Sequence, residues 1–322
     1  MIVDHQVHWF PPASLNMLVG RTRLPRAERS GEMWLLEIVE GRQMSVGREL
    51  TDLEAQLVLA SNLGVDVLVI SPPSLGECQH LPGTEAAEIL HRVNAELAAA
   101  QRMHPDRLVG LAMLPMQDPE VAITVLEEAA ELGLRGICML SSIEGRPIAT
   151  DETLPVFRRM DELGMPLVLH PAVRSQTRTP GGLPSVGESG IGWMAHTALA
   201  ALNLIESGTL DKCPNLVVLH PHLGGVLPYV IGRVERIQNE RAPLAIGEYL
   251  RSRFFTDTVN RTRGAIKLAF DTYGIDHVLF GTDHPFEQMA AMKQFIVSQG
   301  VADIVFGNVL PGLLPPSLQD TQ

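Results

Sequence analysis

The sequence predicts an α/β fold in which eight parallel strands and their crossover helices close into one (β/α)8 barrel. Short apolar runs alternate with amphipathic segments along the chain, which is the pattern of parallel strands joined by helices. Eight such runs are present. The first ends in Gln6 and His8 and the last in Asp283, nearly the whole sequence apart, and a closed barrel brings such ends together.

The elements can be placed in order along the chain. The expected strands are 2–7, 65–71, 108–114, 136–140, 166–170, 216–220, 254–258 and 277–281. The clearest expected helices, with apolar residues at three- and four-residue spacing, are 51–63, 84–103, 119–132 and 262–273. A chain of 322 residues can bury a large core as a single barrel domain with insertions, so 1–322 is interpreted as one domain.

Composition excludes several classes of protein. The net charge of -12, without a long basic run, argues against nucleic acid or an anionic membrane as the main partner, and a small molecule is the expected one. Cys78, Cys138 and Cys213 are widely spaced, which argues against a disulfide framework and a cysteine zinc site. No leader sequence and no apolar stretch of about 18 residues is present, so a cytoplasmic location is expected.

Two long segments interrupt the pattern of short connections. The first, about 10–50, leaves the carboxyl end of the first strand, where barrel active sites lie, and is expected to be a cap over the pocket. The second, about 172–192, is rich in Gly, Pro, Ser and Thr and follows the fifth strand, so we expect an active-site loop. The alternative is that both are mobile surface loops.

Ligand-type side chains end four of the expected strands. Side chains alternate along a strand, so Gln6 and His8 share one face, where a His-x-His pair would bind a divalent metal well. Gln is the weaker ligand, and His8 alone could be a structural strand-end histidine. His170, His222 and Asp283 follow strands five, six and eight. Imidazole and carboxylate suit Zn²⁺, with Mn²⁺ possible.

These residues resemble the aminocarboxymuconate semialdehyde decarboxylase branch of the amidohydrolase superfamily, which also includes γ-resorcylate decarboxylases. The resemblance spans almost the full chain and implies a barrel of the metal-dependent hydrolase type. The matching segments are Val3-Asp4-His5-Gln6-Val7-His8, Val168-Leu169-His170, His222-Leu223-Gly224-Gly225 with Pro228 and Arg233, Gly281-Thr282-Asp283-His284-Pro285, and Phe306-Gly307-Asn308.

The resemblance also implies roles for single residues. His8 and His170 would bind the metal, Asp283 would be both ligand and proton carrier, and His222 would act beside them as acid or base. Arg233 would reach the substrate of a neighbouring subunit, which implies a homodimer. Gln6 departs from the family, in which His or Glu occupies this position, and so weakens the expected metal affinity.

The remaining arginines and histidines are weaker candidates. Arg48 and Arg174, like Arg233, could hold a substrate carboxylate through a bidentate guanidinium, although an exposed Arg is usually only solvated. His220 is expected to support the site from behind. His5 and His196 are expected to be structural, and His284 could contact Asp283 or the substrate.

The leading hypothesis is a metal-dependent, non-oxidative decarboxylase of a small unsaturated or aromatic carboxylic acid that uses no organic cofactor. The metal would act as Lewis acid, while Asp283 or His222 would protonate the carbon that loses CO₂. A hydrolase or hydratase that activates a metal-bound water is the alternative within the same fold. A third possibility is a binding scaffold that has lost metal catalysis, motivated by Gln6.

Overall fold

The computed structural model describes residues 1–173, 187–238 and 243–319. Its main sheet has eight strands, all paired in parallel, in the order β1-β5-β6-β7-β8-β9-β10-β11. They are β1 Val3–His8, β5 Val67–Ser71, β6 Leu108–Ala112, β7 Gly136–Leu140, β8 Leu167–His170, β9 Val218–His220, β10 Phe254–Asp257 and β11 Val278–Leu279. The eight expected strands are thus confirmed, generally slightly shorter than predicted.

The barrel closes between its first and last strands. The backbone N–H of His5 donates to Phe280 O at 2.9 Å, and that of Asp283 donates to Gln6 O at 2.8 Å. Further along the same seam, the N–H of His8 donates to His284 O at 2.7 Å. These bonds continue β11 beside the carboxyl end of β1, so residues from the two ends of the sequence meet at one rim of the barrel.

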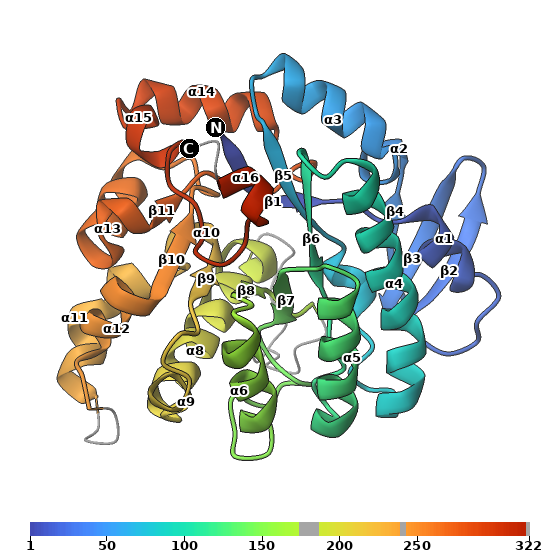
Figure 1. The fold of residues 1–322 in the computed structure, drawn as a ribbon, viewed down its shortest axis with the longest axis horizontal. Helices are drawn as coiled ribbons and strands as arrows, with labels where there is room; N and C mark the ends of the chain where they lie inside the picture. The colour runs from blue at the N-terminus through green and yellow to red at the C-terminus, as the bar shows by residue number, and fades with distance from the viewer. Residues whose placement is uncertain (174–186, 239–242, 320–322) are drawn as a thin grey trace.

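Helices surround the sheet, and Figure 1 shows them on the outside of the strands. The longer ones are α3 Leu53–Asn62, α4 Gly83–Met103, α5 Pro119–Glu131, α6 Leu154–Leu163, α8 Trp193–Glu206, α11 Leu227–Ile237, α12 Ile246–Arg253, α13 Arg263–Tyr273 and α14 Met289–Ser298. The expected helices correspond to α3, α4, α5 and α13. Asp52 and Asp118 cap the starts of α3 and α5, because each carboxylate accepts a backbone N–H of the first turn.

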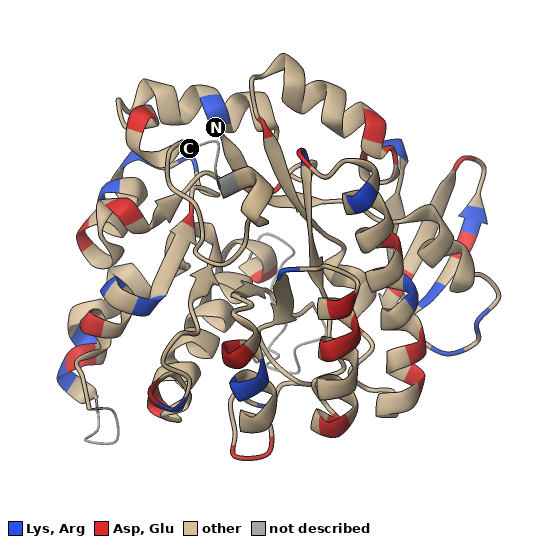
Figure 2. Ribbon diagram, viewed as in Figure 1, with Lys and Arg blue, Asp and Glu red and all other residues tan. Residues whose placement is uncertain are grey.

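Short helical elements occupy the connections and the end of the chain. They are α1 Pro12–Met17, α2 Arg48–Thr51, η1 Pro73–Gly76, η2 Glu188–Gly192, α9 Thr209–Lys212, α10 Pro221–Gly224, η3 Ile275–His277, α15 Ala302–Val305 and α16 Pro316–Gln319. In the view of Figure 2, acidic and basic residues lie mainly on the helices and loops around the barrel. Of the helices in the described part of the chain, none is both long and apolar enough to span a membrane.

The segment after β1 is more ordered than the sequence predicts. It forms a three-stranded antiparallel sheet of β2 Arg26–Ser30, β3 Met33–Val39 and β4 Arg42–Val46, seen at the edge of the barrel in Figure 1. Trp34, Leu36 and Ile38 alternate inward on β3 and are buried. The neighbouring apolar residues hide this period of two, which explains why no strand is evident from the sequence.

The first and second long segments are joined by an ion pair. Both guanidinium nitrogens Nη1 and Nη2 of Arg42, on β4, contact the two carboxylate oxygens of Glu188 at 2.8 and 2.9 Å. Most of the segment 172–192, including Arg174, lies outside the described residues. A covering role for both segments therefore stays a prediction.

Candidate metal-dependent active site

His8 and Asp283 form the centre of the site. The Nδ1 of His8 lies 3.1 Å from Ser71 O, and its Nε2 lies 2.8 Å from Asp283 Oδ1. A carbonyl oxygen only accepts, so Nδ1 carries a proton and Nε2 is the nitrogen that faces the carboxylate. With Nδ1 held by a carbonyl, Nε2 is left to bind a cation together with the carboxylate of Asp283. The local geometry therefore suits a metal ion.

Gln6 joins the same centre from two positions earlier on β1, as the alternation of side chains predicts. Its Nε2 donates to Asp283 Oδ1 at 3.1 Å and lies 3.5 Å from His222 Nε2. Its Oε1 is buried and has no hydrogen-bond partner among the described residues. A buried, unpaired amide oxygen is costly, and a cation ligated by this oxygen would remove that cost.

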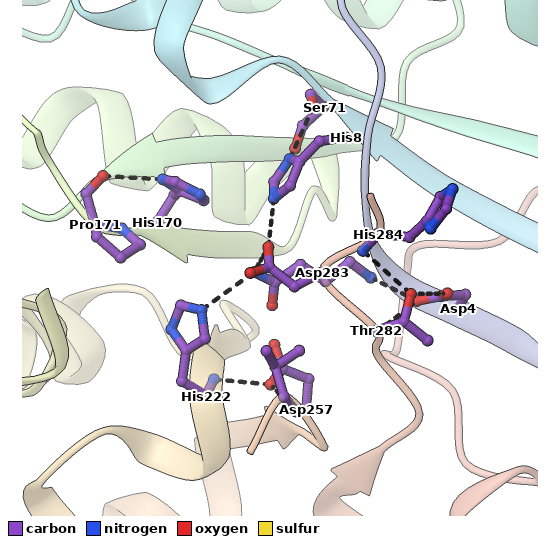
Figure 3. A network of polar contacts seen from close by, with 12 residues as sticks. Asp4, His8, Ser71, His170, Pro171, His222, Asp257, Thr282, Asp283 and His284 are labelled. Atoms are coloured by element: carbon purple, nitrogen blue, oxygen red, sulfur yellow. Dashed lines mark hydrogen bonds and ion pairs between the residues drawn. The ribbon is translucent and has the colours of Figure 1, made fainter. Parts of the chain in front are cut away.

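His170 approaches from the end of β8. Its Nδ1 lies 2.9 Å from Pro171 O, which directs the opposite edge of the ring toward the site, and its ring centroid is 5.3 Å from that of His8. Burial, reinforced by the neighbouring His8, lowers the pKa of His170 to about 3. The imidazole is therefore neutral near pH 7, the form that binds metals. Figure 3 shows His8, His170 and His222 around Asp283.

His222 stands opposite His8 on a left-handed turn after β9. Residues 222, 223, 224 and 225 all have positive φ, at 60°, 53°, 77° and 59°. The backbone N–H of His222 donates to the carboxylate Oδ1 of Asp257 at 2.7 Å (Figure 3). Burial lowers the pKa of His222, so a neutral imidazole faces Gln6 and Asp283 near pH 7.

Asp283 itself has φ 60°, and the residue before it, Thr282, is bound by Asp4. The N–H and hydroxyl of Thr282 donate to the two oxygens of Asp4 at 2.9 and 2.6 Å. Burial works to raise the pKa of Asp283, but the hydrogen bond from His8 and the neighbouring imidazoles outweigh it, and the pKa lies below its ordinary value. Asp283 is therefore an anion near pH 7.

Of the three arginines expected to bind substrate, the two that the structure describes, Arg48 and Arg233, do not contact this centre. Arg48 has an 84% exposed side chain that contacts Asp52 at 2.7 Å. Arg233 is exposed on α11. Arg174 lies outside the described residues. The structure thus shows no contact of Arg48 or Arg233 with the site of their own chain.

The other histidines fall largely where the sequence places them. His5 is buried, with Nδ1 2.9 Å from Phe280 O and Nε2 accepting the N–H of Leu310. His220 is buried behind the site, with Nδ1 2.9 Å from Tyr273 Oη. His196 lies on α8. His284 serves the site through its backbone carbonyl, which accepts the N–H of His8.

Sequence reasoning did not identify Asp257 or Phe286, and it did not assign Asp4 a role. Asp4 and Asp257 could have been noticed as acidic residues inside apolar strands. Phe286 is 53% exposed, yet its ring centroid lies 5.4 Å from that of His8. The only feature of the sequence that could have pointed to Phe286 was its position three residues after Asp283.

The donor set fits a divalent cation. His8, His170 and Asp283 lie around one centre (Figure 3), and Gln6 contacts Asp283 through Nε2. The tautomer of His8 is fixed by a carbonyl, as is usual for metal-binding histidines. Within the described residues, no three His, Cys, Asp or Glu side chains form a ready-made metal cluster, and His8 and Asp283 contact each other directly. Together with His170, this pair would supply the imidazole and carboxylate ligands of the ion.

Comparison with known proteins supports this interpretation. The model of the amidohydrolase family matches residues 3–306. A 2-amino-3-carboxymuconate-6-semialdehyde decarboxylase of Dictyostelium discoideum is 31% identical over 69% of this chain, a match that spans only 63% of that relative. A γ-resorcylate decarboxylase of a Polaromonas species is 31% identical over 74% of this chain and 79% of the relative. A 2-keto-4-carboxy-3-hexenedioate hydratase of a Sphingobium species is 26% identical over 71% of this chain and 68% of the relative.

Solved structures show the same architecture. The Metarhizium anisopliae IDCase in its apo form superposes with a TM-score of 0.80 over 95% of both chains, at 22% identity. A Polaromonas dihydroxybenzoic acid decarboxylase with bound manganese and the inhibitor 2-nitroresorcinol gives a TM-score of 0.69 at 27% identity, over 81% of this chain and 85% of that one. With strand-end ligands, barrel and family model in agreement, the chain belongs to the amidohydrolase family.

Proposed function

We propose that this protein is a metal-dependent, non-oxidative decarboxylase of a small aromatic or unsaturated carboxylic acid. One observation carries the proposal. Gln6 Nε2 lies between the carboxylate of Asp283 and the imidazole of His222, so the ligand centre and a second proton-carrying group share one buried site. The curated relatives with decarboxylase activity support this reaction class.

His8, His170 and Asp283 would hold the metal, with the amide oxygen of Gln6 as a fourth ligand. When bound, a divalent cation polarises the substrate carboxylate and an adjacent oxygen. We propose Zn²⁺ from the imidazole and carboxylate ligands, with Mn²⁺ as the alternative that the manganese-bound relative favours. No organic cofactor is required for this chemistry.

Proton delivery falls to Asp283 or His222. In decarboxylation the bond between carbon and carboxylate breaks, the electron pair stays on the carbon, and a proton takes the place of CO₂. Asp283 has a lowered pKa and must first gain a proton, whereas neutral His222 can both give and accept one. Both groups lie within reach of Gln6, so either could serve a carbon held above the ligand centre.

The position of Phe286 favours a flat substrate. Its ring is half-exposed beside His8, although large apolar side chains usually pack inward. An aromatic ring seated against Phe286 would gain stacking contact while its carboxylate pointed to the ligand centre. This placement favours an aromatic or conjugated acid over a flexible aliphatic one.

We further propose a homodimer in which Arg233 reaches the carboxylate of a substrate bound to the partner. Tyr229, Arg233 and Ile237 stand four residues apart on α11 and form one exposed stripe, with Tyr229 85% and Ile237 66% exposed. Large exposed apolar groups flanking an exposed guanidinium suit an interface. Arg48 and Arg174 remain candidate carboxylate holders from the two covering segments.

The protein is proposed to be cytoplasmic. Cys78, Cys138 and Cys213 are all buried as free thiols. Burial raises the pKa of both Cys78 and Cys138 to about 12, which keeps these thiols unreactive. Unpaired structural cysteines suit a reducing compartment.

Release of CO₂ tests the reaction class. The metal-loaded protein is incubated with γ-resorcylate and with related hydroxybenzoates, and headspace CO₂ is expected to rise in step with substrate loss. Asp283→Asn should abolish it, because an amide can neither ligate as an anion nor deliver a proton. Metal-free protein with full activity would contradict the metal-dependent mechanism.

A hydratase is the second candidate, favoured by the Sphingobium relative. Its product gains the mass of one water and no CO₂ appears, so mass spectrometry of the same reactions separates the two activities. In that case neutral His222 would take the proton of the attacking water.

A further inference from the structure

Two acidic residues interrupt the apolar strands of the barrel. The eight strands lie entirely within the described residues, and Asp4 and Asp257 are their only acidic or basic members apart from histidines. Both carboxyls are fully buried. Asp4 is accounted for by its bonds to Thr282 and to the N–H of Gln6. In the part of the chain that the structure describes, Asp257 has no such partner side chain, so its burial needs another explanation.

Asp257 accepts only backbone donors among the described residues. Its Oδ1 receives the N–H of His222 at 2.7 Å and that of Val259 at 3.0 Å, while Oδ2 has no partner there. Burial raises the pKa of Asp257 to about 7. The carboxyl is therefore held at an energetic cost in a place where its best contact is to one residue of the site, His222.

The turn at His222 needs such support. Four consecutive residues, 222–225, adopt left-handed backbone, and the first two are not glycine. The left-handed conformation is unfavourable for His222 and Leu223 because Cβ crowds the following carbonyl. A strained turn persists only where surrounding groups hold it, and the bond from His222 N to Asp257 is the contact at its start.

The barrel leaves space for this contact. A Cβ placed on Gly281 would lie 2.8 Å from Cβ of Asp257 and 3.5 Å from Cβ of Gln6. The side chains of Asp257 and Gln6 thus share the space beside Gly281. Asp257 thus lies near Gln6, and its carboxyl accepts the backbone N–H of His222 (Figure 3).

We propose that Asp257 is the positioning residue of His222: its carboxyl holds the left-handed turn that aims His222 Nε2 at Gln6 and Asp283. This inference rests on the proposed function in so far as His222 carries a proton in the reaction. Asp257 touches no reacting atom. Its effect should appear in turnover, because a misplaced proton carrier slows the chemical step more than it weakens substrate binding.

Three variants test it in the metal-loaded protein with γ-resorcylate. Asp257→Ala removes the acceptor and is expected to lower kcat about 100-fold while KM changes by less than about threefold. Asp257→Asn keeps a carbonyl oxygen that can accept the same N–H, so it should rescue kcat to within roughly fivefold of wild type. Thr256→Val is the matched control: Thr256 is equally buried on β10, has an unpartnered hydroxyl in the described structure, and should stay within about twofold.

Hydrogen exchange of the zinc-loaded protein supplies a readout independent of turnover. By mass spectrometry, peptides covering 221–225 should exchange faster in Asp257→Ala and unchanged in Asp257→Asn and Thr256→Val. If the wild-type protein shows no turnover, the proposed activity is refuted. The exchange rates of peptides 221–225 still decide whether Asp257 holds the turn.

Two results would overturn the positioning role. The first is an Asp257→Ala protein with wild-type exchange at 221–225 or with kcat within about threefold of wild type. The second is an Asp257→Asn protein as impaired as Asp257→Ala, because acceptance of the N–H would then not be what matters. If Asp257→Ala does not fold, Asp257→Asn decides alone: faster exchange at 221–225, or loss of more than roughly 20-fold in kcat, overturns the proposal.

Discussion

His8 Nε2 and Asp283 Oδ1 lie 2.8 Å apart although 275 positions separate them in the sequence. The same two segments form the seam of the barrel, where the N–H of His8 bonds to His284 O and that of Asp283 to Gln6 O. The backbone bonds that close the fold therefore also fix the distance between the two principal ligand candidates. Precision of this kind is what a metal site requires of its scaffold.

Metal content should separate ligands from the proton carrier. His8→Ala and His170→Ala are expected to fall from about one divalent ion per chain to below roughly a fifth, because each removes one of few protein ligands. His222→Ala should keep its metal and lose turnover about 100-fold or more, since general acid–base catalysis contributes on that order. Elemental analysis after gel filtration and steady-state kinetics provide the two measurements.

His277→Gln is the control for these variants. His277 stacks on Phe255 with ring centroids 4.2 Å apart, and its Nδ1 lies 2.8 Å from Phe254 O at the start of β10. Its loss should alter neither metal content nor turnover. Full metal retention by both His8→Ala and His170→Ala would show that the ion, if bound, lies elsewhere.

Gln6 should weaken metal binding relative to histidine at this position. An amide oxygen is a poorer donor to zinc than an imidazole nitrogen, so Gln6→His is expected to retain metal longer against a chelator such as EDTA. Its turnover is expected to fall, because the bridge from Gln6 Nε2 to Asp283 and His222 would be lost. The half-time of metal loss is the quantity to compare.

Gln6→Asn provides the matched control, since it keeps the amide but shortens its reach to the ligand centre. It should lose metal faster than wild type. Equal or poorer retention in Gln6→His would show that residue 6 does not occupy a ligand position.

The sequence was sufficient to predict the barrel and the convergence of its strand ends. The apolar runs of β5, β7 and β8 are short and continuous, which is how strands buried on both faces read. The parity of β1 correctly placed Gln6 and His8 together, even though the pairing of β1 with β5 shifts register between Asp4 and Val7.

Other features of the structure could not be predicted from the local sequence. The sheet 26–46 was missed because β2 is mostly charged, and its strand character depends on pairing with β3. The left-handed turn at His222 could not be predicted either. The paired glycines explain the backbone of two of its four residues, and the conformation of the other two depends on Asp257, 35 positions away. Tertiary contacts, not local propensity, fix both.

Subunit mixing tests whether Arg233 crosses an interface. Arg233→Ala and Asp283→Asn homodimers should each be nearly inactive, with Arg233→Ala keeping its metal. After subunit exchange, a mixed dimer places one intact Arg233 and one intact Asp283 at the same site, so activity should return to at most about one site in four of the mixed population. The measurement is activity after exchange, with labelled subunits to prove that mixing occurred.

The control mixes Arg233→Ala with wild type at the same ratio: each mixed dimer keeps one active site of two, so the total activity should not change as the subunits exchange. A monomer by light scattering, or no recovery in spite of proven exchange, would place Arg233 outside a shared site.

The pH dependence of stability should report the burial of His220. Burial lowers the pKa of His220 to about 3, so the native imidazole stays neutral while the unfolded one takes up a proton below its ordinary value of 6.5. The contribution of His220 to the free energy of unfolding is therefore fully preserved above pH 6.5 and declines as the pH falls toward 3, by up to about 1.4 kcal/mol per pH unit.

In His220→Gln that contribution disappears, so urea unfolding between pH 7.5 and 4.5 should give a flatter decline than wild type. Tyr273→Phe removes the bond to His220 Nδ1 but keeps the imidazole, so it should lower stability while retaining the wild-type slope. Parallel curves for His220→Gln and wild type would mean that native His220 titrates as it does in the unfolded chain.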